Sequence, residues 1–212
     1  MIKTGKEHLE SLRDGRVVFI GDERIEDVTT HPAFRRAAKT VAGLYDLKHQ
    51  RENREILTFQ EGDQTHSMWF LQARNKDDLR KRMAAHKLIA DQTCGMMGRS
   101  MDHVSSFVTG MSTNPSIFDT EKHKFSENIM SYYNYMKEND IFATYAVLPP
   151  QAARNPEFYQ KKNLPIPTLM VTGQDAEGVT ISGMKMLATS AVFCNDIWIG
   201  NLLPLAPDQV KQ

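Results

Sequence analysis

The chain has 212 residues, enough for one large domain or two small ones. Its 26 basic and 26 acidic side chains balance, so charge gives no case for binding nucleic acid or an acidic membrane surface. The two cysteines, Cys94 and Cys194, are far apart, which favours a reducing cytoplasm over a zinc site or a disulfide framework. No apolar run reaches the ~18 residues of a transmembrane helix, and the N-terminus lacks the apolar core of a signal peptide.

The first 140 residues carry mainly helical patterns. Asp14-Gly15 ends the first helix, and Thr30-His31-Pro32 begins the second. The patterns predict helices over 5–13, 33–48, 76–94, 104–110 and 117–138, and strands over 17–20, 24–28, 56–59 and 67–71. In the helix over 76–94 the expected core residues are Leu79, Met83, Leu88 and Ile89, and the expected solvated residues are Lys81, Arg82 and Lys87.

After residue 140 the patterns become those of strands. An extended run over 141–148 stops at Pro149-Pro150, and a polar loop is predicted over 151–164. Strands are predicted over 168–172, 178–183 and 193–200, with a hairpin turn over 174–178. We therefore expect an α+β chain with a helical domain over 1–140, including a small hairpin region, and a β domain over 141–212. Three strands alone leave apolar surface uncovered, so we expect a fragment or a covering partner chain.

The candidate site is Arg99-Ser100-Met101-Asp102-His103, which follows a break made by Gly95 and Gly98. An Arg fixed at a helix end can bind a carboxylate or a phenolate, and a nearby His can move protons near neutral pH. In the alternative interpretation Arg99 and Asp102 form a local ion pair and His103 is a satisfied polar residue. Spacing alone leaves both open.

Familiar catalytic motifs are absent from the sequence. There is no Gly-x-Gly-x-x-Gly dinucleotide fingerprint, no phosphate-binding P-loop and no Gly-x-Ser-x-Gly nucleophile elbow. The seven histidines show no metal-ligand spacing, so no metal site is predicted.

Six runs spread over the chain share the order and spacing of one known family. They are residues 4–16, 21–35, 44–49, 98–103, 149–154 and 183–189. Together these runs resemble the 4-hydroxyphenylacetate 3-hydroxylase family, the large oxygenase component of two-component, reduced-flavin-dependent hydroxylases of phenols and chlorophenols.

The resemblance implies an acyl-CoA-dehydrogenase-like fold, with a helical N-terminal domain, a middle β-barrel and a C-terminal four-helix bundle. This chain would hold the N-terminal domain and the first part of the barrel, with the bundle absent. A full-length form would be a cytoplasmic homotetramer.

The implied reaction uses reduced FAD, or alternatively FMN, from a separate reductase. Flavin and molecular oxygen would form a C4a-hydroperoxide, whose terminal oxygen passes to the ring carbon ortho to a phenol hydroxyl. The family's Arg-x-Pro-Asp-Tyr substrate motif would be Arg99-Ser100-Met101-Asp102-His103 here. Tyr145 aligns with a family His that faces the phenol hydroxyl. The implied catalytic residues are therefore Arg99, His103 and Tyr145, and we hypothesise that His103 and Tyr145 have exchanged roles.

The family's flavin contacts also transfer onto this sequence. They would be Tyr145, Ala146, Val147, Gln151, Arg154 and Thr189, of which Thr189 would bind the N5 edge of the flavin. Arg154 as a surface charge and Thr189 as an ordinary strand residue are the alternatives. A second function is a catalytically incompetent fragment that only folds or associates. A dehydratase is the third, and it needs cysteine ligands for an iron–sulfur cluster that two cysteines do not supply.

Overall fold

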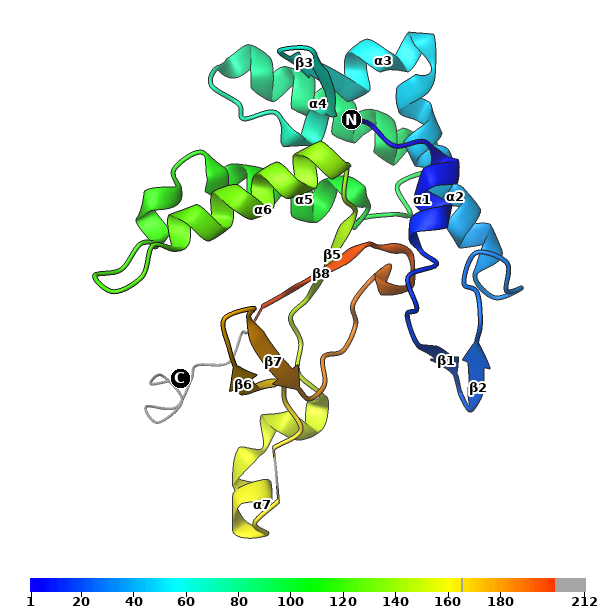
Figure 1. The fold of residues 1–212 in the computed structure, drawn as a ribbon. Coiled ribbons are helices and arrows are strands. Elements are labelled where there is room, and N and C mark those ends of the chain that lie inside the picture. Colours follow the sequence, from blue (N-terminus) through cyan, green and yellow to red (C-terminus); the bar gives the residue numbers. More distant parts are fainter. Residues whose placement is uncertain (165, 201–212) are drawn as a thin grey trace. The chain divides into compact units, whose positions relative to one another are not determined.

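The computed structural model describes residues 1–164 and 166–200 and forms two compact units (Figure 1). Unit 1 contains Met1–Thr144 and Ser190–Asp196; unit 2 contains Tyr145–Thr189 and, of the described residues, 197–200. Strands β5 (Ala143–Ala146) and β8 (Asp196–Ile199) pair, and the chain passes from one unit to the other within both strands. The end of the β domain predicted over 141–212 lies outside the described residues beyond residue 200, and the predicted domain boundary after residue 140 stays a prediction.

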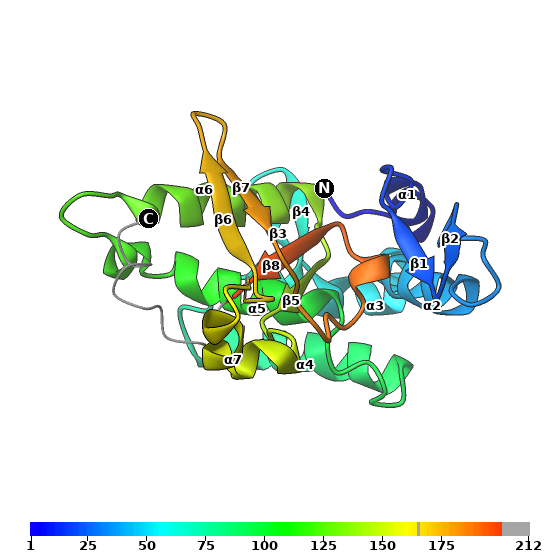
Figure 2. The same ribbon diagram turned by 90° about the horizontal axis from the view of Figure 1, so that it is seen from below.

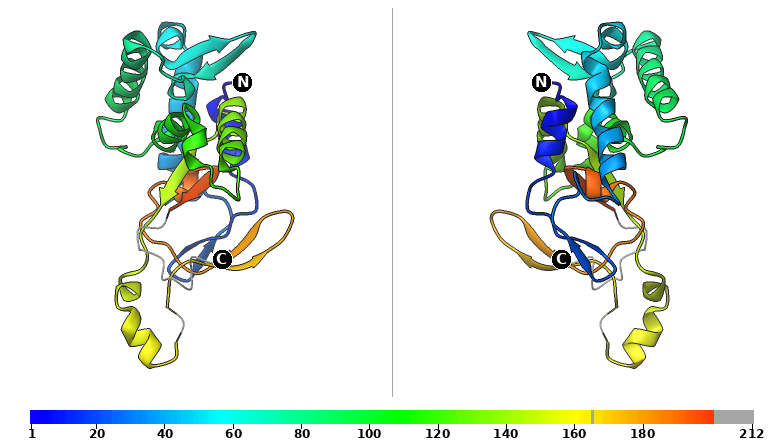
Figure 3. Two further views of the ribbon diagram at one scale, coloured as in Figure 1. Left: turned by 90° about the vertical axis from the view of Figure 1, so that its left-hand side faces the viewer. Right: turned by 90° about the vertical axis from the view of Figure 1, so that its right-hand side faces the viewer.

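Unit 1 is built mainly of helices. Its α-helices are α1 Gly5–Ser11, α2 Arg35–Asp46, α3 Arg51–Leu57, α4 Lys76–Gln92, α5 Met101–Ser112 and α6 Phe125–Asn139. Its short 3-10 helices are η1 Leu47–His49, η2 Met68–Phe70, η3 Pro115–Phe118 and η5 Ala191–Phe193. Two antiparallel hairpins complete it, β1 Val18–Ile20 with β2 Glu23–Ile25 and β3 Thr58–Glu61 with β4 Gln64–Ser67. Figure 3 shows the β3–β4 hairpin beside α3 in two opposite views.

The first helix, α1, begins with a capping box and packs closely on α2. The Thr4 side chain accepts from the Glu7 backbone N–H while the Glu7 carboxylate accepts from Thr4, so two otherwise unpaired groups are satisfied. Gly5 lies directly against α2, and a Cβ at this position would overlap the Ala42 carbonyl oxygen. The Gly5 N–H instead donates to Asp46 Oδ1 at 2.7 Å. The glycine therefore sets the distance between the two helices.

The core of unit 1 lies where α5 packs on α6 and on η2 (Figure 2). Two side chains join these elements by hydrogen bonds to the η2 backbone, from Thr109 Oγ1 to Trp69 O at 3.0 Å and from the Tyr133 hydroxyl to Phe70 O at 2.8 Å. The largest fully buried apolar side chains of the unit are Trp69, Tyr45, Phe70, Phe142, Leu57, Ile89, Met101 and Met136. The start of α5 is thereby anchored by Met101.

A fully buried ion pair lies in the same core. Lys48 Nζ binds Asp140 Oδ2 and donates to Ser67 Oγ at 3.1 Å, and Ser67 donates to Asp140 Oδ1 at 2.6 Å. The backbone N–H of Lys3 also donates to this carboxylate at 2.9 Å. Burial would raise the pKa of Asp140, but Lys48 and these hydrogen bonds outweigh it and lower the pKa. The carboxylate is therefore ionised and saturated with donors.

Several predicted elements of unit 1 need correction. Residues 56 and 57, predicted as strand, end helix α3, and residues 68–70 form η2. Leu57, Met68, Trp69 and Phe70 are buried by packing among helices rather than in a sheet, whereas Ile56 is exposed. The predicted helix over 117–138 is interrupted between η3 and α6, and the predicted helix over 104–110 begins earlier, at Met101. On α4, Leu79 and Met83 are exposed while Ala85 is buried, so the predicted core face is wrong there.

The described part of unit 2 contains a hairpin and two short helices. β6 (Met170–Gln174) pairs antiparallel with β7 (Val179–Ser182), and the turn between them closes where Asp175 N donates to Gly178 O at 2.9 Å (Figure 2). The predicted hairpin is thus confirmed. The stretch predicted as a loop over 151–164 instead forms η4 (Gln151–Arg154) and α7 (Pro156–Lys161), which Asn155 caps through Phe158 N. The hairpin's apolar side chains are exposed: Met170, Val171, Val179 and Ile181.

Candidate functional site

The Arg99–His103 segment joins a turn to the first turn of α5. Helix α4 ends near Gln92, and the left-handed backbone of Cys94 (φ 51°) and Gly95 (φ 70°) redirects the chain. Ser100 is extended and buried, and α5 starts at the next residue. Arg99 therefore precedes the helix, whereas His103 lies within its first turn, where its N–H donates to Ser100 O at 3.1 Å.

Asp102 is held by partners other than Arg99. Its Oδ2 lies 2.5 Å from His86 Nδ1, and its Oδ1 accepts from Ser100 Oγ. Burial would raise the pKa of the Asp102 carboxyl, but the hydrogen bonds from His86 and Ser100 outweigh this and lower it. The alternative of an Arg99–Asp102 ion pair is wrong: the ion-pair partner of Asp102 is His86, on α4. Sequence reasoning missed His86 because 16 residues separate it from Asp102 and no motif links them.

His103 and Arg99 remain without such partners. Burial first, and then the charge of Arg99, lower the pKa of His103, although Asp102 opposes them, so the ring is neutral at pH 7. His103 Nδ1 is buried and has no hydrogen-bond partner among the described residues. Arg99 is partly buried, and within the described part of the chain it makes no ion pair and no side-chain hydrogen bond. A cation without an ion-pair partner in the described residues, near a neutral imidazole, suits a small anionic or phenolic ligand.

Three predicted site residues lie on or just after β5, in unit 2. The Tyr145 side chain lies against Gly200, where a Cβ would overlap the Tyr145 hydroxyl. Ala146 O accepts from Gly200 N at 3.1 Å, and Val147 O accepts from Lys185 Nζ at 3.2 Å. Ala146 and Val147 are therefore placed by backbone contacts with distant segments.

The other predicted flavin residues are also in unit 2. Gln151 and Arg154 are exposed on η4, and Thr189 is exposed on an irregular segment between Leu187 and Ser190, both with positive φ. The Thr189 N–H donates to Leu187 O at 3.0 Å. These three side chains are thus accessible within the described structure, which a ligand-binding role requires. Arg99–His103 belong to unit 1, so the two groups are described separately.

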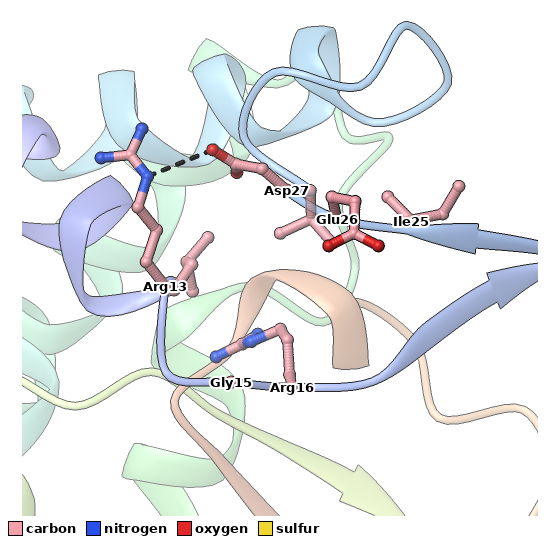
Figure 4. Close-up of a pocket in the computed structure, with 8 residues that line it drawn as sticks. Arg13, Gly15, Arg16, Ile25, Glu26 and Asp27 are labelled. Carbon is pink, nitrogen blue, oxygen red and sulfur yellow. Dashed lines mark hydrogen bonds and ion pairs between the residues drawn. The ribbon is translucent and has the colours of Figure 1, made fainter.

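A cavity of about 230 Å³ lies near the start of unit 1, between the end of α1 and β2. Figure 4 shows Arg13 reaching Asp27, and Arg13 Nε donates to Asp27 Oδ2 at 3.1 Å. Arg16, in the same wall, is paired with Asp14 at 2.7 Å. Both guanidinium groups are thus already neutralised, and none of the predicted site residues lines this cavity.

Membrane-spanning helices and metal-binding clusters are both absent from the described residues. No helix there is both long and apolar enough to cross a membrane. Residues 1–164 and 166–200 contain no group of three or more His, Cys, Asp or Glu side chains placed to hold a metal ion.

The structure is that of an α+β chain whose candidate site is the Arg99–His103 segment at the start of α5. The chain matches the family model described as "4-hydroxyphenylacetate 3-hydroxylase N terminal" over residues 4–211. It therefore belongs to the 4-hydroxyphenylacetate 3-hydroxylase family, as the sequence runs indicated.

Individual relatives agree with this assignment. The chain is 38% identical over 193 residues to the 4-hydroxyphenylacetate 3-monooxygenase oxygenase component of Thermus thermophilus, covering 89% of this chain and 38% of the relative. It is 33% identical to the oxygenase component of a Rhodococcus 4-nitrophenol 2-monooxygenase, covering 93% and 37%. A crystal structure of a 4-hydroxyphenylacetate 3-monooxygenase oxygenase component complexed with FAD superposes with a TM-score of 0.85 at 35% identity, covering 98% of this chain and 43% of that one. The chain thus spans about two fifths of the length of these relatives.

Proposed function

We propose that this chain is the N-terminal part of the oxygenase component of a two-component flavin-dependent monooxygenase that hydroxylates a phenol at the ortho position. The observation that carries the proposal is the pairing of Arg99, a cation without a carboxylate partner in the described structure, with the buried, unpartnered Nδ1 of a neutral His103. The relatives support it, because they are oxygenase components of phenol-type hydroxylases.

The substrate side of the site is assigned to the start of α5. Arg99 binds the phenolate and stabilises negative charge as it develops. Neutral His103 accepts the phenol proton at the ring nitrogen that lacks a partner in the described structure. Ser100 and Asp102 hold the turn, and Met101 anchors it in the core. A phenol would thus be ionised and oriented by these side chains.

The flavin side is assigned to unit 2. The accessible side chains of Gln151, Arg154 and Thr189, with Tyr145, Ala146 and Val147 on the strand side, would hold FAD, and FMN is the alternative. A hydrogen-bonding side chain, a cation and backbone groups fit the polar edge and phosphates of a flavin. The chemistry supplied by bound reduced flavin is the activation of molecular oxygen, one atom of which goes to the phenol and the other to water. A separate reductase in the same cytoplasm would supply the reduced flavin.

Tyr145 and His103 are proposed to have exchanged roles relative to the family pattern. A phenolic hydroxyl is a poor base at neutral pH but a good hydrogen-bond donor. His103→Ala should then remove proton acceptance, and Tyr145→Phe should lower phenol affinity alone. Equal, small effects of both changes on coupled hydroxylation would contradict the exchange.

The decisive experiment is turnover of a panel of para-substituted phenols by the longest natural form of the protein. Reduced FAD and oxygen are supplied, and catechol product is measured against oxygen consumed. We expect coupled ortho-hydroxylation of at least one phenol. Absence of product from every phenol, with flavin bound, would overturn the proposal.

The second candidate is a fragment that folds or associates without catalysis. The exposed apolar side chains of β6 and β7 favour it, because such surface needs a covering element. In the relatives' fold, a C-terminal helical bundle and tetramer formation would provide this cover. We expect the 212-residue chain alone to give no product with reduced flavin, and stoichiometric product from it would exclude this candidate.

A further inference from the structure

The ring of His86 bridges two helices beside the candidate phenol site. His86 lies on α4, and both of its nitrogens face α5: Nδ1 is 2.5 Å from Asp102 Oδ2 and Nε2 is 3.3 Å from Ser106 Oγ. Because a carboxylate can only accept, Nδ1 carries the hydrogen and donates it. Over residues 1–164 and 166–200, these are the side-chain hydrogen bonds that join α4 to α5.

The turn that carries Arg99 has few other restraints. Residues 94–96 are tied back to the end of α4, where Gly95 N donates to Ala90 O at 2.8 Å. Residues 97–99 make no ion pair and no side-chain hydrogen bond within the described structure. The direction of Arg99 is therefore set by the next residue, Ser100, which is buried and bonded to Asp102.

This bridge does not depend on the charge of His86. In the neutral ring, the Ser106 hydroxyl donates to Nε2; in the protonated ring, Nε2–H donates to Ser106 Oγ. The Nδ1–H donates to Asp102 in both states. The contact with Asp102 therefore persists in both protonation states of the ring.

The order Ser106, His86, Asp102 is also that of a hydrolase triad. Ser106 lies in the middle of α5, where the backbone N–H groups are used within the helix. A nucleophilic serine also needs free backbone N–H groups to stabilise the oxyanion. No such pair of amides is left beside Ser106, so the arrangement does not support a nucleophilic role for it. A positioning role needs no such pair.

We propose that His86 is a positioning residue of the phenol site: through Asp102 it fixes the first turn of α5 and so orients Arg99 and His103. The expected effect on phenol binding rests on the proposed function, but the hydrogen bond from His86 to Asp102 (the clamp) can be tested without flavin. The chain offers matched variants, because an Asn amide replaces Nδ1 and a Gln amide replaces Nε2. His86→Asn keeps a donor to Asp102, whereas His86→Gln keeps only the contact with Ser106.

The first measurement is amide hydrogen exchange at residues 101–104 in the 212-residue chain. We expect His86→Gln to exchange there at least tenfold faster than the parent, with α6 unchanged, and His86→Asn to stay within threefold of the parent. Equal exchange in the Gln variant and the parent would overturn the clamp. So would equal acceleration in the Asn and Gln variants, because the Asp102 contact would then be irrelevant.

The second measurement uses 4-nitrophenol and FAD with the longest natural form. We expect His86→Gln to weaken 4-nitrophenol binding at least fivefold with flavin affinity unchanged, and His86→Asn to restore most of the binding. Parallel losses of both ligands, or no loss of 4-nitrophenol binding, would overturn the positioning role. Arg99→Ala separates the two proposals: if it leaves 4-nitrophenol binding intact, the proposed phenol site fails, while the exchange data still judge the clamp.

Discussion

Two charged clusters of unit 1 differ in how completely their polar atoms are paired. Asp140 accepts from Lys48, Ser67 and the Lys3 backbone, and the side chains of Lys48, Ser67 and Asp140 are buried. In the Arg99–His103 segment, Asp102 is saturated in the same way, but Arg99 and His103 Nδ1 have no partner in the described residues. The polar atoms around Asp140 are therefore used within the fold, whereas Arg99 and His103 Nδ1 can still bind a ligand.

The difference separates structural from functional use of charge. A buried ion pair with every atom satisfied resists change, because removing one partner leaves an isolated charge in a medium of low dielectric constant. A cation with free donors beside a neutral imidazole is costly for folding unless solvent or a ligand completes it. Each prediction below tests this contrast.

The largest expected effect is on stability, from Asp140→Asn. The amide retains the shape and tolerates the left-handed backbone of Asp140 (φ 46°), but it leaves Lys48 buried without a counter-charge. We expect a loss of about 3–5 kcal/mol in the free energy of unfolding, measured by urea titration. The double variant Lys48→Met, Asp140→Asn should recover at least half of the loss, and a loss below ~1 kcal/mol in the single variant would break the contrast.

Arg99→Ala should show the opposite behaviour. We expect a loss of about 10²–10³-fold in phenol hydroxylation by the longest natural form, because a donor to developing negative charge is removed. The free energy of unfolding of the 212-residue chain should change by less than ~0.5 kcal/mol, since Arg99 has no partner to lose in the described structure. Arg99→Lys keeps the charge but not the planar guanidinium group. Its rate of phenol hydroxylation should lie between those of the parent and Arg99→Ala. If Arg99→Ala lost stability but kept its hydroxylation activity, Arg99 would have a structural role and not a functional one.

His8 sharpens the contrast because it is buried and also has an unpartnered Nδ1 in the described part of the chain. Its Nε2 donates to Phe193 O at 3.0 Å, and the ring stacks on Tyr45. Burial, with the charge of Lys3, lowers the pKa of His8 to about 4. The unfolded chain therefore takes up this proton near pH 6.5 and the folded chain only near pH 4, so stability falls as pH falls between these values.

We expect His8 to contribute on the order of 2 kcal/mol to the loss of stability between pH 7 and pH 5. His8→Gln keeps a donor for Phe193 O and does not titrate, so it should remove that part of the pH dependence while leaving hydroxylation unchanged. The check is urea unfolding at both pH values. An unchanged pH slope would show that His8 takes up its proton at the same pH in the folded and the unfolded chain.

The smallest effect concerns a saturated but accessible cluster, the capping box of α1. Thr4→Ala removes the acceptor for Glu7 N and should cost about 1 kcal/mol, because water replaces the lost partner. Thr4→Ser retains the hydroxyl and is the matched control. Thermal unfolding of both variants measures the difference, and a cost comparable to that of Asp140→Asn would show that burial is not what separates the clusters.

Local patterns predicted the elements whose signals are local. The hairpins over 17–28 and 168–183 follow from alternation and turn residues, and α2 and α4 follow from helical periodicity, although α2 begins at Arg35 without a side-chain cap rather than at the predicted Thr30-His31-Pro32. The errors fall where tertiary packing decides. Ile56 and Leu57 have strand-like side chains but end a helix, and Leu79 and Met83 follow the helical period yet face outward because Ala85 and Ile89 form the contact face of α4.

The candidate site divides in the same way. The sequence by itself determined the family and the position of the Arg99–His103 segment, because residue order and spacing are properties of the chain. The partner of Asp102, the unpaired nitrogen of His103 and the involvement of His86 were decided only by the tertiary structure. Hydrogen bonds and burial depend on which helices meet, and α4 brings His86 to the start of α5 across 16 residues that no local pattern connects. The opening segment of α5 is thus located by sequence, and its chemistry is set by packing.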